Sequence, residues 1–412
     1  MNIKINPTKL GGKVINPPSK SVAHRLIISA ALAKGTSVIT NLYPSVDILA
    51  TMDCMRELGA KIDFKGDTAT IIGIENPPRK ATLNCHESGS TLRFLIPVAC
   101  ALGVECTFVG HGKLPTRPIT PYIDQFPKHG VELDFSDAKE GGFLPCTVKG
   151  KLTAGRFEID GGISSQFITG LLFALPLLDG NSEIIMTSRL ESKPYVDITL
   201  SCLKNFGGEV IETEHGYAVK GMQSLKACDS SVEGDYSQAA FYRVANALGS
   251  DIEIQGLNEN SCQGDKAIME ICQKSELNNG KLKPFCVDCS DIPDLVPILT
   301  VLACFCDGKS EITNVARLRI KECDRLEAIS ACLNSLGGKV RAYDDRLEIE
   351  GVTSLSGGEV YAYNDHRIAM AMAIASTKCT GDLIIKGAEC VSKSYPNFFE
   401  HFKMLGGEFT KI

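Results

Sequence analysis

One feature of the sequence constrains the fold more than any other: a single plan is repeated along the whole chain. A junction in which Gly ends a helix and an apolar alternation begins a strand recurs with regular spacing. Its copies lie at 58–62, 129–133, 206–210, 336–340 and 405–409, and a degenerate copy lies at 278–282. Repeats of this kind decide the architecture, because each copy must form the same supersecondary unit.

A second element recurs with the same regularity: a polar start, a strongly apolar helix, a Gly turn and a β-branched strand. Its six copies run over Ser19–Thr40, Ser88–Val109, Ser164–Met186, Asp235–Ile254, Asp291–Ile312 and Asp365–Ile385. With the junctions, these copies predict six βαβαββ repeats, which we number one to six in chain order. A plain solenoid scaffold is the weaker interpretation, because solenoid repeats are shorter and stack in one dimension.

The sixth repeat is one strand short. Only 47 residues follow Asp365, and they supply two helices and two strands, at 383–386 and 408–412. The N-terminal segment Asn2–Asn6 fits the missing strand, and we expect repeat one to begin after it, near Gly12. The set of repeats would then close on itself.

Six repeats predict an α/β (α+β) protein with two pseudo-threefold domains, each of three βαβαββ repeats. Repeats one to three begin with Ser and repeats four to six with Asp, which supports this division. We expect residues 16–228 to form one domain, and residues 1–15 and 229–412 to form a discontinuous second domain. The chain would cross between them twice, near 12–16 and 226–232, and such a double crossing is a natural hinge.

The starts of the apolar helices carry unexpected cations. Ser, Asp and Asn at these starts are ordinary N-caps, but capping does not explain Lys20, Arg25, Arg93 and Arg367 in first or second turns. The helix dipole disfavours positive charge there, and a bound anion would remove the conflict. If three helix starts from each domain face a cleft between the domains, its ligand should carry more than one negative charge.

Composition excludes several classes of partner. The chain has 43 Lys and Arg against 49 Asp and Glu, a net charge of −6, which argues against a generally basic protein that binds nucleic acid or membrane surfaces. Its longest apolar stretches, 167–178 and 295–306, fall well short of the roughly 20 residues that span a bilayer. The N-terminus lacks the pattern of an export signal, so we expect a cytoplasmic protein.

Neither a metal nor a cofactor is expected. The 17 cysteines are odd in number and scattered, which favours reduced, buried thiols over disulfides. The CxxC at Cys286–Cys289 has no second ligand pair at zinc-finger spacing, and the seven His form no ligand pattern. The phosphate-loop, dinucleotide-turn, zinc-helix and nucleophile-elbow motifs are also missing from the sequence.

Nine short motifs occur in order along essentially the whole chain. They are PSKSxxHR at 18–25, SGSTxR at 88–93, RP at 117–118, SSQF at 164–167, ESKPY at 191–195, GD at 234–235, DIPD at 291–294, KExDR at 321–325 and NDHR at 364–367. Each motif is weak alone, but together they resemble the EPSP synthase family, the 3-phosphoshikimate 1-carboxyvinyltransferases. The fold of that family, two domains of three βαβαββ units with one domain discontinuous, agrees with the repeats.

The resemblance implies transfer of the enolpyruvyl group of phosphoenolpyruvate to the 5-hydroxyl of 3-phosphoshikimate, with release of phosphate, on the route to aromatic amino acids. Each substrate carries a phosphate and a carboxylate, and we expect these two small molecules to be the partners of a monomer. By similarity, 3-phosphoshikimate would contact Lys20, Ser21, Arg25, Ser164, Ser165, Gln166, Ser192, Asp294 and Lys321. Phosphoenolpyruvate would contact Lys20, Gly89, Arg117, Gln166, Arg325, Arg367 and Lys393.

The implied mechanism is addition followed by elimination, which needs two proton-transfer groups. Following the family, Asp294 would be the base and Glu322 the acid, with Lys20 as a further catalytic group, although the sequence does not fix the direction of each transfer. In the simpler structural interpretation, Asp294 caps a helical turn and Glu322 pairs with Arg325. Glu87 and Arg317 stand where relatives often have Asn, which leaves the reaction class unchanged.

Two other functions compete with this one. The sister enolpyruvyl transferase that acts on UDP-N-acetylglucosamine commonly has a Cys in the loop that corresponds to 110–118, and this sequence has none there. A repeat protein that binds anionic metabolites without chemistry would keep the cations. It would have no reason to pair Asp294 with Glu322.

Overall fold

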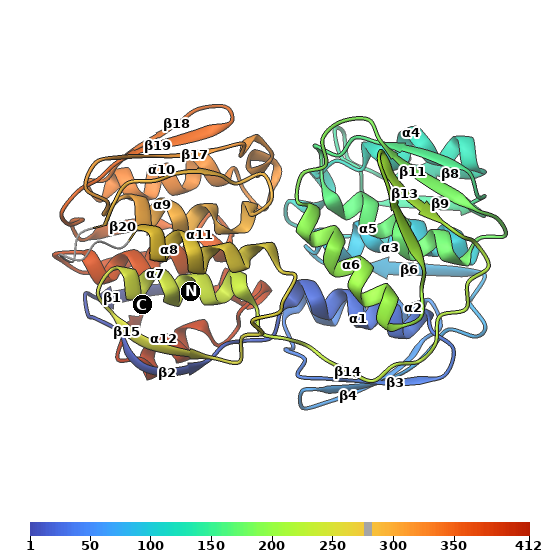
Figure 1. The fold of residues 1–412 in the computed structure, drawn as a ribbon, viewed down its shortest axis with the longest axis horizontal. Coiled ribbons are helices and arrows are strands. Elements are labelled where there is room, and N and C mark those ends of the chain that lie inside the picture. Colours follow the sequence, from blue (N-terminus) through green and yellow to red (C-terminus); the bar gives the residue numbers. More distant parts are fainter. Residues whose placement is uncertain (276–281) are drawn as a thin grey trace. The chain divides into compact units, whose positions relative to one another are not determined.

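The computed structural model describes residues 1–275 and 282–412, and it divides into two compact units. We call Pro18–Glu233 the continuous domain, and Met1–Pro17 with Gly234–Ile412 the discontinuous domain. Each domain contains three of the repeats, and both termini belong to the discontinuous domain (Figure 1). The mixed architecture of sheets and helices confirms the predicted fold class.

The continuous domain consists of repeats one to three. Repeat one comprises β14 (Ser230–Ser231), α1 (Lys20–Leu32), β3 (Thr36–Thr40), α2 (Val46–Glu57), β4 (Lys61–Lys65) and β5 (Thr68–Ile72). Repeat two comprises β6 (Lys80–Asn84), α3 (Gly89–Leu102), β7 (Glu105–Val109), η1 (Leu114–Thr116), α4 (Thr120–Gln125), η2 (Phe126–His129), β8 (Val131–Asp134) and β9 (Cys146–Gly150). Repeat three comprises β10 (Arg156–Ile159), α5 (Ser165–Ala174), η3 (Leu175–Leu177), β11 (Ser182–Met186), α6 (Lys193–Asn205), β12 (Val210–Thr213) and β13 (Gly216–Val219).

The discontinuous domain consists of repeats four to six. Repeat four comprises β2 (Gly11–Ile15), α7 (Tyr236–Ala247), β15 (Asp251–Gln255), η4 (Gly264–Lys266) and α8 (Ala267–Ser275). Repeat five comprises β16 (Cys286–Asp288), η5 (Pro293–Leu295), α9 (Val296–Ala303), β17 (Lys309–Thr313), η6 (Ala316–Ile320), α10 (Arg325–Ser335), β18 (Lys339–Ala342) and β19 (Arg346–Glu350). Repeat six comprises β20 (Gly358–Tyr361), α11 (His366–Ala375), η7 (Ser376–Lys378), β21 (Leu383–Lys386), η8 (Ala388–Lys393), α12 (Phe398–Met404), β22 (Glu408–Lys411) and β1 (Asn2–Asn6).

Five repeats form the same four-stranded sheet. In each, the first strand pairs parallel with the second, and the remaining strands pair antiparallel, as in β6-β7-β9-β8 and β16-β17-β19-β18. In repeats two, three, five and six the parallel pair is joined by a buried crossover helix, which a parallel connection requires, whereas repeat one takes its first strand, β14, from residues 230–231. In repeat four the described residues form the two-stranded sheet β15-β2, and the predicted junction at 278–282 falls largely outside the described residues.

Most predicted junctions and helix starts are confirmed. Five junction glycines, Gly59, Gly130, Gly207, Gly337 and Gly406, have positive φ, as the ends of helices favour. Five predicted starts carry N-caps whose side chains accept a backbone N–H: Ser19, Ser88, Ser164, Asp235 and Asp365. Asp291 is different, because Pro293 begins a short 3₁₀ turn before α9. This turn, rather than a helix interior, carries Asp294.

The N-terminal strand completes repeat six, as predicted. β1 lies between β21 and β22 and pairs antiparallel with both. Successive side chains of β1 point to opposite faces of the sheet, which buries Ile3 and Ile5 and leaves the flanking polar residues outside the core. The sixth repeat is therefore built from the first and the last strands of the described chain.

The expected start of repeat one near Gly12 is wrong. β2, which contains Gly12, pairs parallel with β15 and so belongs to repeat four. Repeat one takes its first strand from β14, which pairs parallel with β3 and places Ser230 and Ser231 in the continuous domain. The division lies after Pro17 and after Glu233, because each strand stays with the sheet that it extends.

Buried helices form the centre of each domain. In the continuous domain, α3 packs on α5, α5 on α6 and α6 on α1. In the discontinuous domain, α7, α9 and α11 pack on one another, and the sheet of repeat five lies against α9 (Figure 1). α3, α5 and α9 are apolar on nearly every side, as helices covered all round must be. Many of the predicted site residues therefore lie at or next to the N-terminal ends of these buried helices.

Candidate active site

Arg325 is the centre of a polar cluster in the discontinuous domain. It begins α10, and its guanidinium is buried among three carboxylates. Nε donates to Asp365 at 2.7 Å, Nη1 to Asp294 at 3.0 Å and Nη2 to Glu322 at 2.8 Å. The fixed fork of a guanidinium allows one side chain to hold three acids at defined positions. The two predicted proton-transfer groups, Asp294 and Glu322, are thus brought together on one cation.

Arg367 holds the other oxygen of Asp294. It lies in the first turn of α11, and its Nη2 donates to Asp294 Oδ2 at 2.8 Å and to Ser237 Oγ at 3.1 Å. Its Nη1 donates to the backbone carbonyl of Asp294 at 3.2 Å. The orientation of Asp294 is therefore set by two arginines from different repeats.

The cations around Asp294 decide its charge. Burial alone raises the pKa of Asp294, but Arg367, Arg325 and Lys321 more than offset burial and hold the pKa well below its usual range. The same cluster raises the pKa of Arg325 in spite of its burial, because Asp365, Glu322 and Asp294 stabilise the cation. In the described structure Asp294 is therefore an anion with little tendency to accept a proton.

Lys321 and Lys393 approach the same cluster from loops. Lys321 follows η6 and lies near enough to Asp294 to stabilise its negative charge. Lys393 ends η8 and donates from Nζ to the carbonyl of Asn364 at 2.8 Å. Every site residue predicted in the discontinuous domain is thus found around the starts of α9, α10 and α11.

In the continuous domain, Lys20 and Ser21 form the first turn of α1. Ser19 caps the helix, and Lys20 Nζ lies 2.8 Å from Asp47 Oδ2. Both side chains are largely shielded from solvent, so water screens this ion pair less than it screens a typical surface pair. Asp47 therefore reduces the conflict between Lys20 and the helix dipole, and it holds the ammonium group in place.

Arg25 is anchored by neutral groups. Its Nη1 donates to Ser21 O at 2.7 Å, its Nη2 to Tyr195 O at 2.8 Å, and its Nε to Thr199 Oγ1 at 2.7 Å. The guanidinium also lies over the ring of Phe94, 5.1 Å from its centroid. These contacts orient the guanidinium of Arg25.

Gly89 and Arg117 touch where α3 begins. A Cβ built on Gly89 would lie 2.6 Å from Arg117 Nη1, so the guanidinium occupies the space that a side chain would need. Arg93 links this region to Gln166, because its Nη1 donates to Gln166 Oε1 at 2.9 Å and its Nη2 to Pro118 O at 2.8 Å. Arg117 and Gln166 are thus both connected to the first two turns of α3.

The predicted serines lie at two helix starts. Ser164 caps α5 by accepting the Gln166 N–H at 3.3 Å, and Ser165 is the first residue of that helix. Ser192 precedes α6 with φ 58°, a left-handed conformation that is uncommon for a residue other than Gly. All three serines are buried, so their hydroxyl groups lie in pre-organised positions beside free helix N-termini.

The family model described as EPSP synthase (3-phosphoshikimate 1-carboxyvinyltransferase) matches residues 5–402. The chain belongs to the EPSP synthase family. A relative from Clostridium beijerinckii, named 3-phosphoshikimate 1-carboxyvinyltransferase, is 47% identical over 432 residues, covering 100% of this chain and 98% of the relative. One of the same name from Clostridium kluyveri is 48% identical over 419 residues, covering 98% and 97%.

Solved structures show the EPSP synthase fold. The EPSP synthase of Acinetobacter baumannii aligns with a TM-score of 0.81 at 24% identity, over 100% of both chains. The enolpyruvyl transferase NikO of Streptomyces tendae aligns with a TM-score of 0.80 at 16% identity, over 99% of this chain and 98% of that chain. At these identities the likeness concerns the fold alone.

In this EPSP synthase family member, sequence reasoning missed two acidic partners of the predicted cations, Asp365 for Arg325 and Asp47 for Lys20. Asp365 was expected to cap α11, and it does so through Arg367 N at 2.8 Å, but its second oxygen also binds Arg325. Asp47 carries no motif, because a single Asp in the first turn of α2 is an ordinary helix residue. The signal available for Asp365 was its place inside the NDHR motif at 364–367, two residues before Arg367.

The described residues of this family member give no sign of a metal centre or a membrane span. They contain no group of three or more His, Cys, Asp and Glu side chains placed to hold a metal ion. Within the same residues, no helix is both long and apolar enough to cross a bilayer. All 17 cysteines are free, and most are buried.

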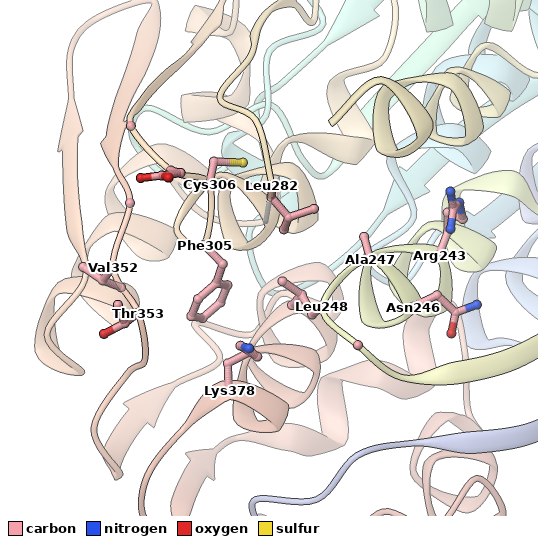
Figure 2. Close-up of a pocket in the computed structure, with 14 residues that line it drawn as sticks. Arg243, Asn246, Ala247, Leu248, Leu282, Phe305, Cys306, Val352, Thr353 and Lys378 are labelled. Atoms are coloured by element: carbon pink, nitrogen blue, oxygen red, sulfur yellow. The ribbon is translucent and has the colours of Figure 1, made fainter. Parts of the chain in front are cut away.

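A pocket of about 740 Å³ in the discontinuous domain contains none of the predicted site residues (Figure 2). Leu248 lines it just after α7, Phe305 just after α9 and Lys378 at the end of η7, which follows α11. The pocket therefore lies at the C-terminal ends of the three buried helices. Carbonyl groups at such ends favour cations over phosphates, so the pocket is a poor place for the anionic substrates.

Proposed function

We propose that the chain transfers the enolpyruvyl group of phosphoenolpyruvate to the 5-hydroxyl of 3-phosphoshikimate, giving 5-enolpyruvylshikimate 3-phosphate and phosphate. The observation that carries this proposal is the pair of carboxylates, Asp294 and Glu322, held by Arg325 and next to Arg367. In a site that only bound anions, two acids among the cations would weaken the attraction for the ligand. Acids in defined positions are what proton transfer to and from carbon requires.

The substrate contacts are part of the proposal. For 3-phosphoshikimate we propose Lys20, Ser21, Arg25, Ser164, Ser165, Gln166, Ser192, Asp294 and Lys321, and for phosphoenolpyruvate Lys20, Gly89, Arg117, Gln166, Arg325, Arg367 and Lys393. The buried helix starts favour this assignment, because free N–H groups and the helix dipole attract phosphate and carboxylate groups.

The reaction proceeds by addition and elimination. The 5-hydroxyl gives its proton to a base and its oxygen bonds to C2 of phosphoenolpyruvate, while an acid delivers a proton to C3, which gives a tetrahedral intermediate. The intermediate then loses phosphate from C2 and a proton from the methyl group. We assign Glu322 as the acid and Asp294 as the base, with Lys20 stabilising the negative charge near the reacting carbon.

Substrate binding itself would activate Asp294. Without substrate, Arg325 and Arg367 hold this carboxylate as a weak base. The phosphate and carboxylate of phosphoenolpyruvate compete for the same two guanidinium groups. As these anions take over the cations, Asp294 loses the partners that lower its pKa and becomes a better proton acceptor. The base is then active only when the substrate is in place.

A phosphate-release assay tests the proposed function. The protein is mixed with phosphoenolpyruvate and either 3-phosphoshikimate or UDP-N-acetylglucosamine, and inorganic phosphate is measured over time. Release of phosphate in the mixture with 3-phosphoshikimate, but not in the mixture with UDP-N-acetylglucosamine, supports the proposal. Release with the UDP-sugar would instead favour the sister enolpyruvyl transferase. Binding of 3-phosphoshikimate without release from either mixture would identify a metabolite-binding protein.

We also propose that the enzyme acts as a monomer in the cytoplasm. All the proposed contacts come from one chain, so no second copy is needed to complete the site. The free thiols suit a reducing compartment, where disulfides rarely persist.

A further inference from the structure

Two neighbouring residues of α1 connect it to its flanking helices. His24 and Arg25 are both buried, and each contacts a threonine of a different helix. Arg25 donates to Thr199 of α6, which lies 3.0 Å from Thr169 of α5. His24 contacts Thr51 of α2, and Thr51 contacts Thr91 of α3. Helix α1 thus begins two separate chains of buried hydrogen bonds.

The chain that starts at His24 reaches the cap of α3. His24 Nδ1 lies 2.7 Å from Thr51 Oγ1, and Thr51 Oγ1 lies 2.7 Å from Thr91 Oγ1. Thr91 Oγ1 donates to Ser88 Oγ at 2.7 Å. None of these four side chains is more than 1% exposed, so water cannot replace a lost bond.

The proton directions in this chain follow from the donors available. Because Thr91 donates its hydrogen to Ser88, the hydrogen of the Thr51 hydroxyl serves its two acceptors, Thr91 Oγ1 at 2.7 Å and Asp47 O at 3.3 Å. His24 must then donate from Nδ1 to Thr51, which fixes its tautomer. Burial lowers the pKa of His24 well below its usual value, with help from Lys20 and Arg25, so the ring is neutral. The hydrogens of His24 and Thr91 therefore both point along the chain towards Ser88.

Two members of this chain of hydrogen bonds, Thr51 and Ser88, lie close to residues proposed to contact phosphoenolpyruvate. Thr51 is one turn from Asp47, the partner of Lys20, and its hydroxyl is also 3.3 Å from Asp47 O. Ser88 caps α3 through Thr91 N at 3.2 Å and precedes Gly89, against which the Arg117 guanidinium lies. A shift of Thr51 would therefore change the positions of Lys20 and Arg117.

We propose that Thr51 is a positioning residue that fixes the Lys20–Asp47 pair relative to the start of α3, and so aligns the groups that meet phosphoenolpyruvate. This inference rests on the proposed function. Arg25, a proposed 3-phosphoshikimate contact, belongs to the other chain of hydrogen bonds, through Thr199. Of the groups that Thr51 would align, Lys20 is proposed for both substrates, whereas Gly89 and Arg117 are proposed for phosphoenolpyruvate alone. Loss of the Thr51 hydroxyl should therefore affect phosphoenolpyruvate much more than 3-phosphoshikimate.

The test compares Thr51→Val, which removes the hydroxyl at nearly constant volume, with Thr51→Ser, which keeps it. Steady-state phosphate release is measured with each substrate varied in turn, and 3-phosphoshikimate affinity is measured by calorimetry. We expect Thr51→Val to lower kcat/KM for phosphoenolpyruvate roughly tenfold, the effect of one lost buried hydrogen bond. The dissociation constant of 3-phosphoshikimate should stay within about twofold, and Thr51→Ser should recover most of the loss.

Two further variants separate positioning from stability. Thr107→Val breaks another threonine pair of the same domain, the 2.9 Å contact with Thr147 between two strands, and it should leave both substrates unaffected. Thr91→Val removes the next link of the chain and should reproduce the Thr51→Val result. This second variant keeps the proposal testable even if Thr51→Val does not fold.

The outcomes distinguish this proposal from the proposed function. If the wild-type protein releases no phosphate, the proposed function fails, and the role of Thr51 fails with it. If the wild type is active, Thr51→Val and Thr91→Val with unchanged phosphoenolpyruvate kinetics would overturn the positioning role alone. An equal loss for both substrates, or a loss that Thr51→Ser does not recover, would also overturn it.

Discussion

Replacement of Gly89 by Ala is the sharpest perturbation of the candidate site. The added Cβ would lie 2.6 Å from Arg117 Nη1, 2.8 Å from Cζ and 2.9 Å from Nη2. Carbon and nitrogen atoms in ordinary contact stay about 3.5 Å apart, so the guanidinium must retreat by about 1 Å. The backbone need not move, because Gly89 is a regular helical residue of α3 with no positive φ.

The change should separate folding from substrate binding. Ala favours a helix over Gly by up to about 1 kcal/mol, so the melting temperature should be unchanged or slightly higher. A displacement of about 1 Å in a positioning group can cost up to about a hundredfold in rate. We therefore expect kcat/KM for phosphoenolpyruvate to fall by about ten- to a hundredfold, mainly through KM. The KM for 3-phosphoshikimate should change little.

The assay is steady-state phosphate release with each substrate varied in turn, together with thermal unfolding of both proteins. Gly11→Ala is the matched control, because its Cβ would meet its nearest neighbour, Asp251 O, at 3.4 Å, an ordinary contact distance. An unchanged KM for phosphoenolpyruvate in a folded Gly89→Ala protein would refute the reasoning. So would an equal increase in KM for both substrates, since only one is expected to contact Arg117.

Three further predictions concern the cluster around Arg325. Asp294→Asn and Glu322→Gln should each fold and bind 3-phosphoshikimate, but the rate of single-turnover phosphate release should fall by about 10²- to 10⁴-fold. The exposed control Asp344→Asn should release phosphate at the wild-type rate. Wild-type-like rates in both site variants would contradict their roles. Arg325→Lys should lower the free energy of unfolding in urea by about 3–5 kcal/mol, because a buried Asp365 loses its partner, and a loss below about 1 kcal/mol would contradict this. The folded pKa of Asp294 lies below its unfolded value of 3.8, so its ionised form stabilises the protein above that pH and the contribution is lost on further acidification. The difference in unfolding free energy between wild type and Asp294→Asn should therefore shrink as pH falls below about 4, and a difference that grows would show the opposite sign.

The sequence predicted the repeats well, because hydrophobic periodicity and helix-ending glycines act locally. It also placed β1 correctly, since a strand was missing from repeat six and Asn2–Asn6 had the right alternation. It misplaced β2, because a five-residue strand rich in Gly can extend any sheet with an open edge. Only the pairing of Gly11–Ile15 with β15, a long-range contact, decides where that strand belongs.

For the candidate site, the sequence indicated which residues matter but not how they pair. Cations at helix starts pointed to an anion site before any geometry was known. The structure then added internal partners, such as Asp47 for Lys20 and Asp365 for Arg325. Such pairs form between repeats or between neighbouring helices, and no local spacing predicts them. They also explain how the cations can be buried before a substrate arrives.

The position of β1 has a consequence for the order in which the protein can fold during synthesis. Of the described strands, β1 leaves the ribosome before all others, whereas its neighbours β21 and β22 leave after all others, and Ile412 N donates to Asn2 O at 3.1 Å. The continuous domain has all its strands once Ser231 has been made, so it can fold while the rest of the chain is still being translated. The discontinuous domain must wait until β22 has been made. Nascent chains of about 270 residues, long enough to expose the continuous domain, should therefore contain one protease-resistant domain and an unprotected N-terminal strand.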